Sequence, residues 1–155
     1  MNTERIEKAF LILTGAMLIS FLTALFYAAW GMGMHLPDRA GEILPSAVRE
    51  TPPFDNPGVF ETAPGRYDVV VIGFAWGFEP DEIRIPAGAE VTFKATSVDV
   101  VHGFHIDETR VNVMLLPGQV TELTYRFDEP GEYLLVCHEY CGAGHHLMSG
   151  RVIVE

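Results

Sequence analysis

The sequence predicts a mostly-β protein, in which one β-sandwich domain follows a single N-terminal transmembrane helix. The first observation is the stretch from Ala9 to Leu36, which contains no Asp, Glu, Lys or Arg. A helix needs about 20 apolar residues to cross a bilayer, so this stretch is long enough. The second observation is the chain from Arg66 onward, where short β-branched and aromatic runs alternate with Pro- and Gly-containing turns. That spacing is typical of a sandwich or barrel.

We place the transmembrane helix at residues 9–34 and the preceding residues 1–8 in the cytoplasm. A helix of this length measures roughly 39 Å at 1.5 Å per residue and crosses a bilayer with some tilt. The alternative is a cleaved signal peptide, whose apolar core is only about 7–15 residues long and ends in small residues. Here the apolar stretch ends in bulky residues, FYAAWGMGMH. Arg5 and Lys8 precede the helix and favour a cytoplasmic N-terminus.

Residues 35–64 are predicted to be a linker, and residues 65–155 the folded domain. Prolines make the linker extended and semi-rigid; they are Pro37, Pro45, Pro52, Pro53, Pro57 and Pro64. Within the domain, the hydrophobic pattern predicts strands separated by turns at Pro86-Ala87-Gly88, Pro117-Gly118 and Pro130-Gly131. The expected strands lie at 67–76, 83–85, 91–93, 111–115, 120–127, 132–136 and 150–154.

The domain is strongly acidic. Residues 65–155 contain 14 Asp and Glu against 6 Lys and Arg, a net charge of −8. One interpretation is an acidic face that steers a basic partner protein toward the domain. Solubility alone explains the same charge equally well. Nucleic acid is excluded as a partner, because its phosphates carry the same sign of charge.

The stretch Cys137–Met148, CHEYCGAGHHLM, carries the chemistry of this chain. Two thiols, an imidazole and a thioether follow the pattern C-x-x-x-C-x-x-x-H-x-x-M. Thiolate and thioether together select copper over hard cations, and a thioether is a poor ligand for zinc. Gly142 and Gly144 favour a flexible loop over a helix. The sequence therefore predicts a copper-binding loop between the last two strands.

The two cysteines have a second interpretation, because Cys137 and Cys141 are the only ones in the chain and could form a disulfide. A disulfide does not explain His145 and Met148 at metal-ligand spacing. A mononuclear blue copper site needs only one cysteine beside its histidines and methionine. The second cysteine therefore favours a second copper, with both sulfurs bridging the two ions.

This loop resembles the dinuclear copper (CuA) loop of subunit II of haem–copper cytochrome c oxidases. The resemblance extends through the domain to the N-terminal helix, and a single helix is most similar to the short subunit II of the b-family, or ba-type, oxidases. It implies a cupredoxin-like Greek-key β-sandwich, with a distant histidine ligand in the motif VHGFH at residues 101–105. The ligand set that it implies is His102, Cys137, the backbone carbonyl of Glu139, Cys141, His145 and Met148. His105, His138 and His146 fall outside this set.

The resemblance also implies pairing within the centre and a further cation beside it. His102 and Met148 would serve one copper, and His145 and the Glu139 carbonyl the other. The Glu139 side chain resembles a glutamate that binds Mg²⁺ or Mn²⁺ at the interface with subunit I in larger oxidases. A carboxylate is the hard oxygen ligand that such a cation prefers. The alternative is a carboxylate that is hydrogen-bonded at the subunit interface.

Other residues have a functional and a structural interpretation. Phe74, Trp76 and Phe78 alternate, so we expect them on one face of a strand. They resemble the W-x-[FY]-x-[FY] region through which subunit II receives electrons, although here the Trp is in the middle, and core aromatics are the alternative. Glu7 resembles a carboxylate near the mouth of a proton pathway, and helix capping or solvation explains it equally well.

The function implied by the resemblance is that of the electron-accepting subunit of a terminal cytochrome c oxidase. It would take electrons from cytochrome c and pass them to the haems of subunit I, which reduces oxygen to water. The chain would be single-pass in a bacterial or archaeal plasma membrane, with its C-terminal domain on the periplasmic or outer face. The alternatives are the CuA subunit of a nitric-oxide reductase and, from another class, a membrane-tethered copper carrier. A carrier predicts exposed, labile ligands without the distant His102.

Overall fold

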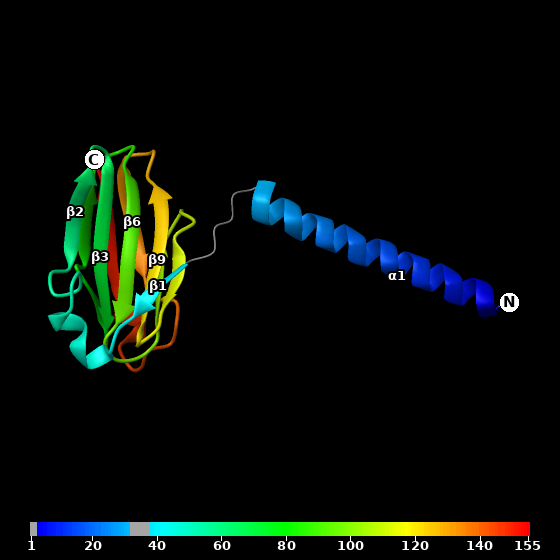
Figure 1. The fold of residues 1–155 in the computed structure, drawn as a ribbon, viewed down its shortest axis with the longest axis horizontal. Coiled ribbons are helices and arrows are strands. Elements are labelled where there is room, and N and C mark those ends of the chain that lie inside the picture. Colours follow the sequence, from blue (N-terminus) through cyan, green and yellow to red (C-terminus); the bar gives the residue numbers. More distant parts are fainter. Residues whose placement is uncertain (1–2, 32–37) are drawn as a thin grey trace. The chain divides into compact units, whose positions relative to one another are not determined.

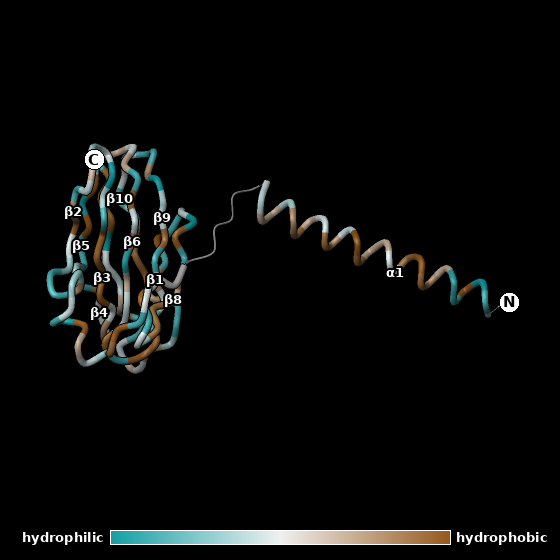
Figure 2. Tube along the Cα trace, in the orientation of Figure 1, coloured by the Kyte–Doolittle hydropathy of each residue, from teal (hydrophilic) through white to brown (hydrophobic). Residues whose placement is uncertain are grey.

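The structure is a computed structural model that describes residues 3–31 and 38–155, in two compact units. The first unit is the helix α1, Thr3–Phe26, which continues as a π-helical turn, Tyr27–Gly31. None of its residues is buried, and Figure 2 shows its hydrophobic stretch. It is long and apolar enough to cross a membrane. The helix starts at Thr3, before the predicted span at 9–34, and residues 32–34 of that span lie outside the described residues.

The second unit is a sandwich of two sheets (Figure 1), which confirms the predicted fold class. Within residues 38–155, one sheet has six strands in the order β1-β9-β6-β3-β2, with β4 paired to β3. The other has five, in the order β5-β11-β10-β7-β8. The first sheet comprises β1 Asp38–Glu42, β2 Gly58–Ala63, β3 Arg66–Phe74, β4 Gly77–Glu79, β6 Glu90–Ser97 and β9 Gln119–Arg126. The second comprises β5 Glu82–Ile85, β7 His102–Ile106, β8 Asn112–Leu115, β10 Gly131–Val136 and β11 Ser149–Val154.

The core lies between the sheets. Successive side chains of a strand point to opposite faces, so every second residue faces inward. Phe104 at the centre is fully buried, and its ring centroid lies 5.4 Å from that of Phe93 and 5.8 Å from that of Phe78. Cys137, Cys141 and Met148 belong to the same buried cluster. The loop that is predicted to bind copper is therefore anchored on the main hydrophobic core.

The prediction of a linker over 35–64 is wrong from residue 38 onward. This segment supplies β1 and β2, and between them a 3₁₀ helix, η2, Pro45–Glu50. Val48 and Phe54 of the segment are buried against Val70 and Ile72, outside the main core. The prediction took the prolines as a sign of an extended linker. Pro45 instead begins η2, where proline is tolerated because the N–H group that it lacks would have no partner within the helix. Residues 35–37 lie outside the described part of the chain.

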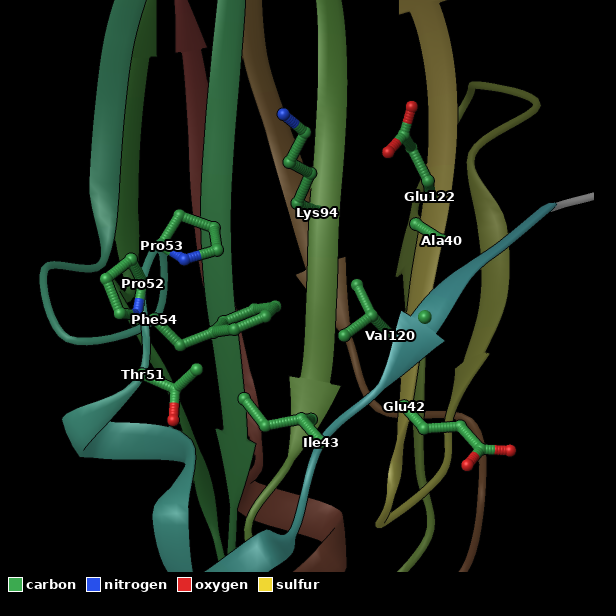
Figure 3. Close-up of a pocket in the computed structure, with 11 residues that line it drawn as sticks. Ala40, Glu42, Ile43, Thr51, Pro52, Pro53, Phe54, Lys94, Val120 and Glu122 are labelled. Carbon is green, nitrogen blue, oxygen red and sulfur yellow. The ribbon is translucent and has the colours of Figure 1, made fainter.

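A shallow hollow of about 370 Å³ lies beside this segment. Figure 3 shows it between β1 and the ring of Phe54, with Lys94 and Glu122 extending from neighbouring strands. Lys94 is paired with Asp68 at 2.6 Å, so its charge is already compensated. Lys94, the positively charged side chain that lines the hollow, is therefore not available to bind an anionic ligand without first leaving Asp68.

Candidate metal centre

Three buried side chains converge where β7 begins and β10 ends. The ligand atoms of His102, Cys137 and Cys141 all lie within 4.8 Å of one another. His102 is the first residue of β7, and Cys137 follows β10 directly. These two strands are antiparallel neighbours. Strand pairing therefore brings a distant histidine to the cysteine loop.

The loop between β10 and β11 supplies the other donors. The Sγ of Cys141 lies 3.8 Å from the Sγ of Cys137, 3.6 Å from Nδ1 of His145 and 3.6 Å from Sδ of Met148. Both cysteines are free thiols. One 3₁₀ turn, η3, His145–Leu147, interrupts the loop. This turn was not predicted, and it folds the His145 and Met148 side chains back onto Cys141.

The His102 ring is poised to bind a metal. The ring is fully buried, and its Nε2 lies 2.8 Å from Oδ1 of Asp99. Its Nδ1 is the only buried side-chain nitrogen or oxygen in the described part of the chain that has no hydrogen-bond partner. Burying an unpaired polar atom costs free energy. A metal-bound histidine almost always donates its other ring N–H to a carboxylate, a backbone carbonyl or a water. Because Nε2 faces the Asp99 carboxylate, Nδ1 is the atom that would bind the metal.

Glu139 points its backbone and its side chain in different directions. Its carbonyl oxygen lies 3.2 Å from Sγ of Cys137, on the side of the metal donors. One of its carboxylate oxygens lies 3.5 Å from Nδ1 of His138. With two thiols, a thioether and two imidazoles nearby, the assembled donor set has the softness that copper requires.

Burial governs the protonation of the Cys141 thiol. Burial, followed by the hydrogen bond with Cys137, raises the pKa of Cys141 to about 11. Without metal, Cys141 is therefore a neutral thiol at pH 7. A coordinated cation reverses this preference, because a metal-bound thiol is deprotonated. Metal uptake should therefore release protons and become tighter as pH rises.

The comparisons with known proteins agree with this geometry. Residues 59–154 match the family of cupredoxin-like domains. Over 153 residues the chain is 40% identical to cytochrome c oxidase subunit 2 of Thermus thermophilus, covering 96% of this chain and 91% of that protein. The chain belongs to the cytochrome c oxidase subunit 2 family. Another subunit 2 from Thermus thermophilus is 46% identical over 113 residues, covering 72% of this chain and 84% of that one.

A solved structure extends the similarity to the whole chain. A chain of a heme–copper terminal oxidase dimer, solved by cryo-EM, aligns with a TM-score of 0.79 and 36% identity. The alignment covers 97% of this chain and 99% of that one. The predicted resemblance is thus confirmed. This member of the subunit 2 family is part of an oxidoreductase complex. Its sandwich is a cupredoxin-like domain. The apolar helix α1 makes it a single-pass membrane protein.

The prediction that Phe74, Trp76 and Phe78 share one strand face is wrong. β3 ends at Phe74, the chain turns at 75–76, and β4 pairs back onto β3 with Phe74 opposite Gly77. Glycine suits position 77 in this turn, because a Cβ there would lie only 2.8 Å from the Phe74 ring. Phe78 enters the core, whereas the Trp76 side chain remains exposed.

Three further histidines of the two motifs contact other groups or are exposed. Nδ1 of His105 bonds the carbonyl of Val111 at 3.0 Å, and His146 is exposed. Nδ1 of His138 lies 3.5 Å from a carboxylate oxygen of Glu139. Their exclusion from the ligand set stays a prediction. Glu7 lies on α1, in the other unit.

Sequence reasoning missed Asp99. Oδ1 of Asp99 accepts hydrogen bonds from the His102 ring at 2.8 Å and from the Val100 N–H at 2.6 Å, and Oδ2 accepts one from the Ala75 N–H at 2.7 Å. Burial opposes its ionisation, but these hydrogen bonds prevail and hold the pKa of Asp99 below its ordinary value. An acidic residue three positions before the predicted ligand His102 was the available signal.

We expect Asp99→Asn to weaken copper binding by about 10- to 100-fold, as is typical when the partner of a ligating histidine is lost. The negative charge of the Asp99 carboxylate orients the His102 Nε2–H and makes the ring bind a metal more strongly through Nδ1. The neutral amide of asparagine lacks this charge. Competition with a copper chelator, measured on the full chain in detergent, tests this. Asp68→Asn is the control, since Asp68 pairs with Lys94 and not with a metal donor. Equal affinities for the Asp99 variant and the wild type would contradict the role of Asp99.

Proposed function

We propose that this chain is the electron-accepting subunit of a terminal cytochrome c oxidase, with a dinuclear copper centre that receives electrons from cytochrome c. The observation that carries the proposal is the pair of buried cysteine sulfurs, 3.8 Å apart and surrounded by soft donors. Two adjacent sulfurs suit two bridged coppers, whereas a mononuclear blue site uses one. A membrane-tethered copper carrier is disfavoured because these ligands are enclosed.

The protein's own residues would hold the centre in the predicted pairing. His102 and Met148 would bind one copper, and His145 and the Glu139 carbonyl the other. When bound, the centre supplies reversible one-electron chemistry. Burial of Cys137, Cys141 and Met148 keeps water away from the sulfurs, and Asp99 fixes the His102 ring. A rigid, enclosed donor set limits the rearrangement that accompanies a change of charge.

Electrons would continue from this centre to the haems of subunit I. The domain would face the periplasm or the cell exterior of a bacterium or archaeon, as its relationship to subunit 2 proteins supports. The test is to purify the intact complex through this chain, extract its haem, and measure gas consumption with reduced cytochrome c. We expect the purified complex to contain haem and to consume oxygen. Nitric-oxide consumption without oxygen uptake would favour the alternative reductase and contradict the oxidase.

Trp76 is our candidate for the residue at which electrons arrive. Its side chain is 46% exposed, and its Nε1–H donates to the carbonyl of Cys141 at 3.0 Å. Phe78 is only 3% exposed and cannot touch a donor protein. Phe74 is half-buried beneath the guanidinium of Arg49, 6.0 Å from its ring. Of the three predicted aromatics, Trp76 alone is both exposed and in contact with the loop.

Electron delivery from a basic cytochrome c should slow steeply as salt rises. Residues 65–155 carry a net charge of −8, and exposed charges are screened over about 8–10 Å at physiological ionic strength. Stopped-flow rates of reduction between about 10 and 200 mM salt measure the effect. A rate that does not change with salt would leave solubility as the only role of the acidic charge.

The Glu139 side chain is our candidate ligand for a Mg²⁺ or Mn²⁺ ion at the interface with subunit I. The carbonyl and carboxylate of Glu139 face different neighbours, so Glu139→Gln separates their roles. We expect the variant complex to keep its copper spectrum and to lose the divalent cation, as measured by metal analysis. A wild-type complex without this cation at saturating Mg²⁺ and Mn²⁺ contradicts the proposal. Loss of the copper spectrum would mean that the side chain holds the loop.

A further inference from the structure

The segment 73–77 contains the end of β3, the turn at residues 75–76 and the first residue of β4, and it contacts the candidate metal site at three points. Gly73 lies against the His102 ring, Ala75 bonds Asp99, and Trp76 covers the cysteine loop. The turn therefore joins two parts of the site that are far apart in the sequence.

Trp76 fits closely on the loop. Its indole N–H donates to the Cys141 carbonyl at 3.0 Å. A Cβ added at Gly144 would lie only 2.5 Å from Cδ2 of the Trp76 ring, and one at Gly142 3.1 Å from its Nε1. The ring therefore rests directly on the glycine backbone, and any larger residue at 144 would displace it. The glycines make the loop flexible by composition, and the ring restricts that flexibility.

The other side of the turn holds the distant histidine. The Ala75 N–H donates to Oδ2 of Asp99 at 2.7 Å, while Oδ1 of Asp99 contacts Nε2 of His102 at 2.8 Å. A Cβ added at Gly73 would lie 3.3 Å from Cδ2 of His102, so the backbone also packs against the ring. One short segment thus fixes His102 through Asp99 and fixes Cys141 through Trp76.

We propose that Trp76 is a positioning residue, which holds the Cys141–Gly144 part of the loop in its metal-binding geometry before copper arrives. This role is separate from electron uptake and rests on the proposed function only for the identity of the metal. The hydrogen bond and the ring contact join protein atoms only, so neither needs a bound metal. Loss of one hydrogen bond of ordinary net strength changes an equilibrium by about fivefold.

The test uses the full chain in detergent, first without copper. Hydrogen–deuterium exchange of the loop amides is measured in wild type, in Trp76→Phe, which keeps a ring but loses the N–H, and in Trp76→Ala. We expect exchange at residues 141–148 to be about fivefold faster in Trp76→Phe and faster still in Trp76→Ala. Phe60→Leu is the matched control, because Phe60 is a partly exposed aromatic on β2. Its loop exchange should equal that of wild type.

Gly144→Ala provides an independent test. Gly144 has φ −91° and ψ 7°, a conformation open to alanine, so its substitution acts through the Trp76 ring and not through the backbone. We expect Gly144→Ala to accelerate loop exchange in the wild type and to have no further effect in Trp76→Ala. Additive effects of the two substitutions would overturn the proposal, because independent sites add. Unchanged exchange in Trp76→Ala would also overturn it.

Copper-loaded protein gives a second measurement. We expect copper release to a Cu(I) chelator to be about fivefold faster in Trp76→Phe, and the reduction potential to shift from that of wild type. Both should be unchanged in Phe60→Leu. A potential that is identical in Trp76→Phe and wild type would contradict a positioning role toward Cys141. If the wild-type chain binds no copper pair, the proposed function fails, whereas the exchange experiment on the metal-free chain still decides the role of Trp76.

Discussion

Cys141→Ser is expected to abolish the shared-valence copper centre. Cys141 has the most central position among the donors, with Cys137, His145 and Met148 all within 3.8 Å of its sulfur. A serine hydroxyl is a hard, weakly acidic donor that cannot replace a bridging thiolate. We expect the variant to hold at most one copper per chain and to lose electron transfer from cytochrome c, measured by metal analysis and stopped-flow absorbance.

Met148→Leu is the matched control for this substitution. The Met148 sulfur is as close to Cys141 as the His145 ring is, but a thioether is a weak axial donor that tunes the potential. We expect Met148→Leu to keep both coppers and to shift the reduction potential. If Cys141→Ser retains two coppers with one shared electron, then Cys141 does not bridge, and the proposed arrangement is wrong.

Phe104→Ala is expected to lower the free energy of unfolding by about 3–5 kcal/mol, the usual cost of deleting a buried phenylalanine ring. Phe104 is fully buried in the main core and contacts the rings of Phe78 and Phe93. It also lies two residues after His102 on β7. The cavity would therefore open directly behind the metal site. Denaturant unfolding of the metal-free chain in detergent, followed by near-ultraviolet circular dichroism, measures the loss.

Phe60→Ala is the control for this stability measurement. Phe60 is 37% exposed on β2 and lies outside both buried clusters. Phe60→Ala should lower the free energy of unfolding far less than Phe104→Ala does, because large losses of stability come from cavities in the core. Equal losses in the two variants would mean that the core is not centred on Phe104.

The sandwich was predictable because its signals are local. Alternating burial along β6 follows directly from the sequence pattern around Val91 and Phe93. The segment 38–63 was not predictable, because its strands are edge strands whose prolines and charged residues resemble a linker. Val48 and Phe54 become buried only when β3 supplies a surface for them. That surface is a property of the tertiary fold.

The candidate metal site also contains residues that could be predicted from the sequence and residues that could not. Four donors lie within the twelve residues Cys137–Met148, so their spacing alone indicates metal binding. Asp99 gave no comparable signal, since its role depends on the His102 ring being buried beside it. The aromatic pattern at Phe74–Phe78 was misleading, because a turn at residues 75–76 breaks the alternation. Trp76 and Phe78 consequently point to different environments.

The most direct test of the account is the copper content of the purified full chain together with its electron paramagnetic resonance spectrum. Both cysteine sulfurs, a ring nitrogen of His102 and the Met148 sulfur lie in one buried group of donors that suits a bridged pair. The account predicts two coppers per chain and a hyperfine pattern from one electron shared by two copper nuclei. One copper per chain, with the hyperfine pattern of a single nucleus, would contradict it.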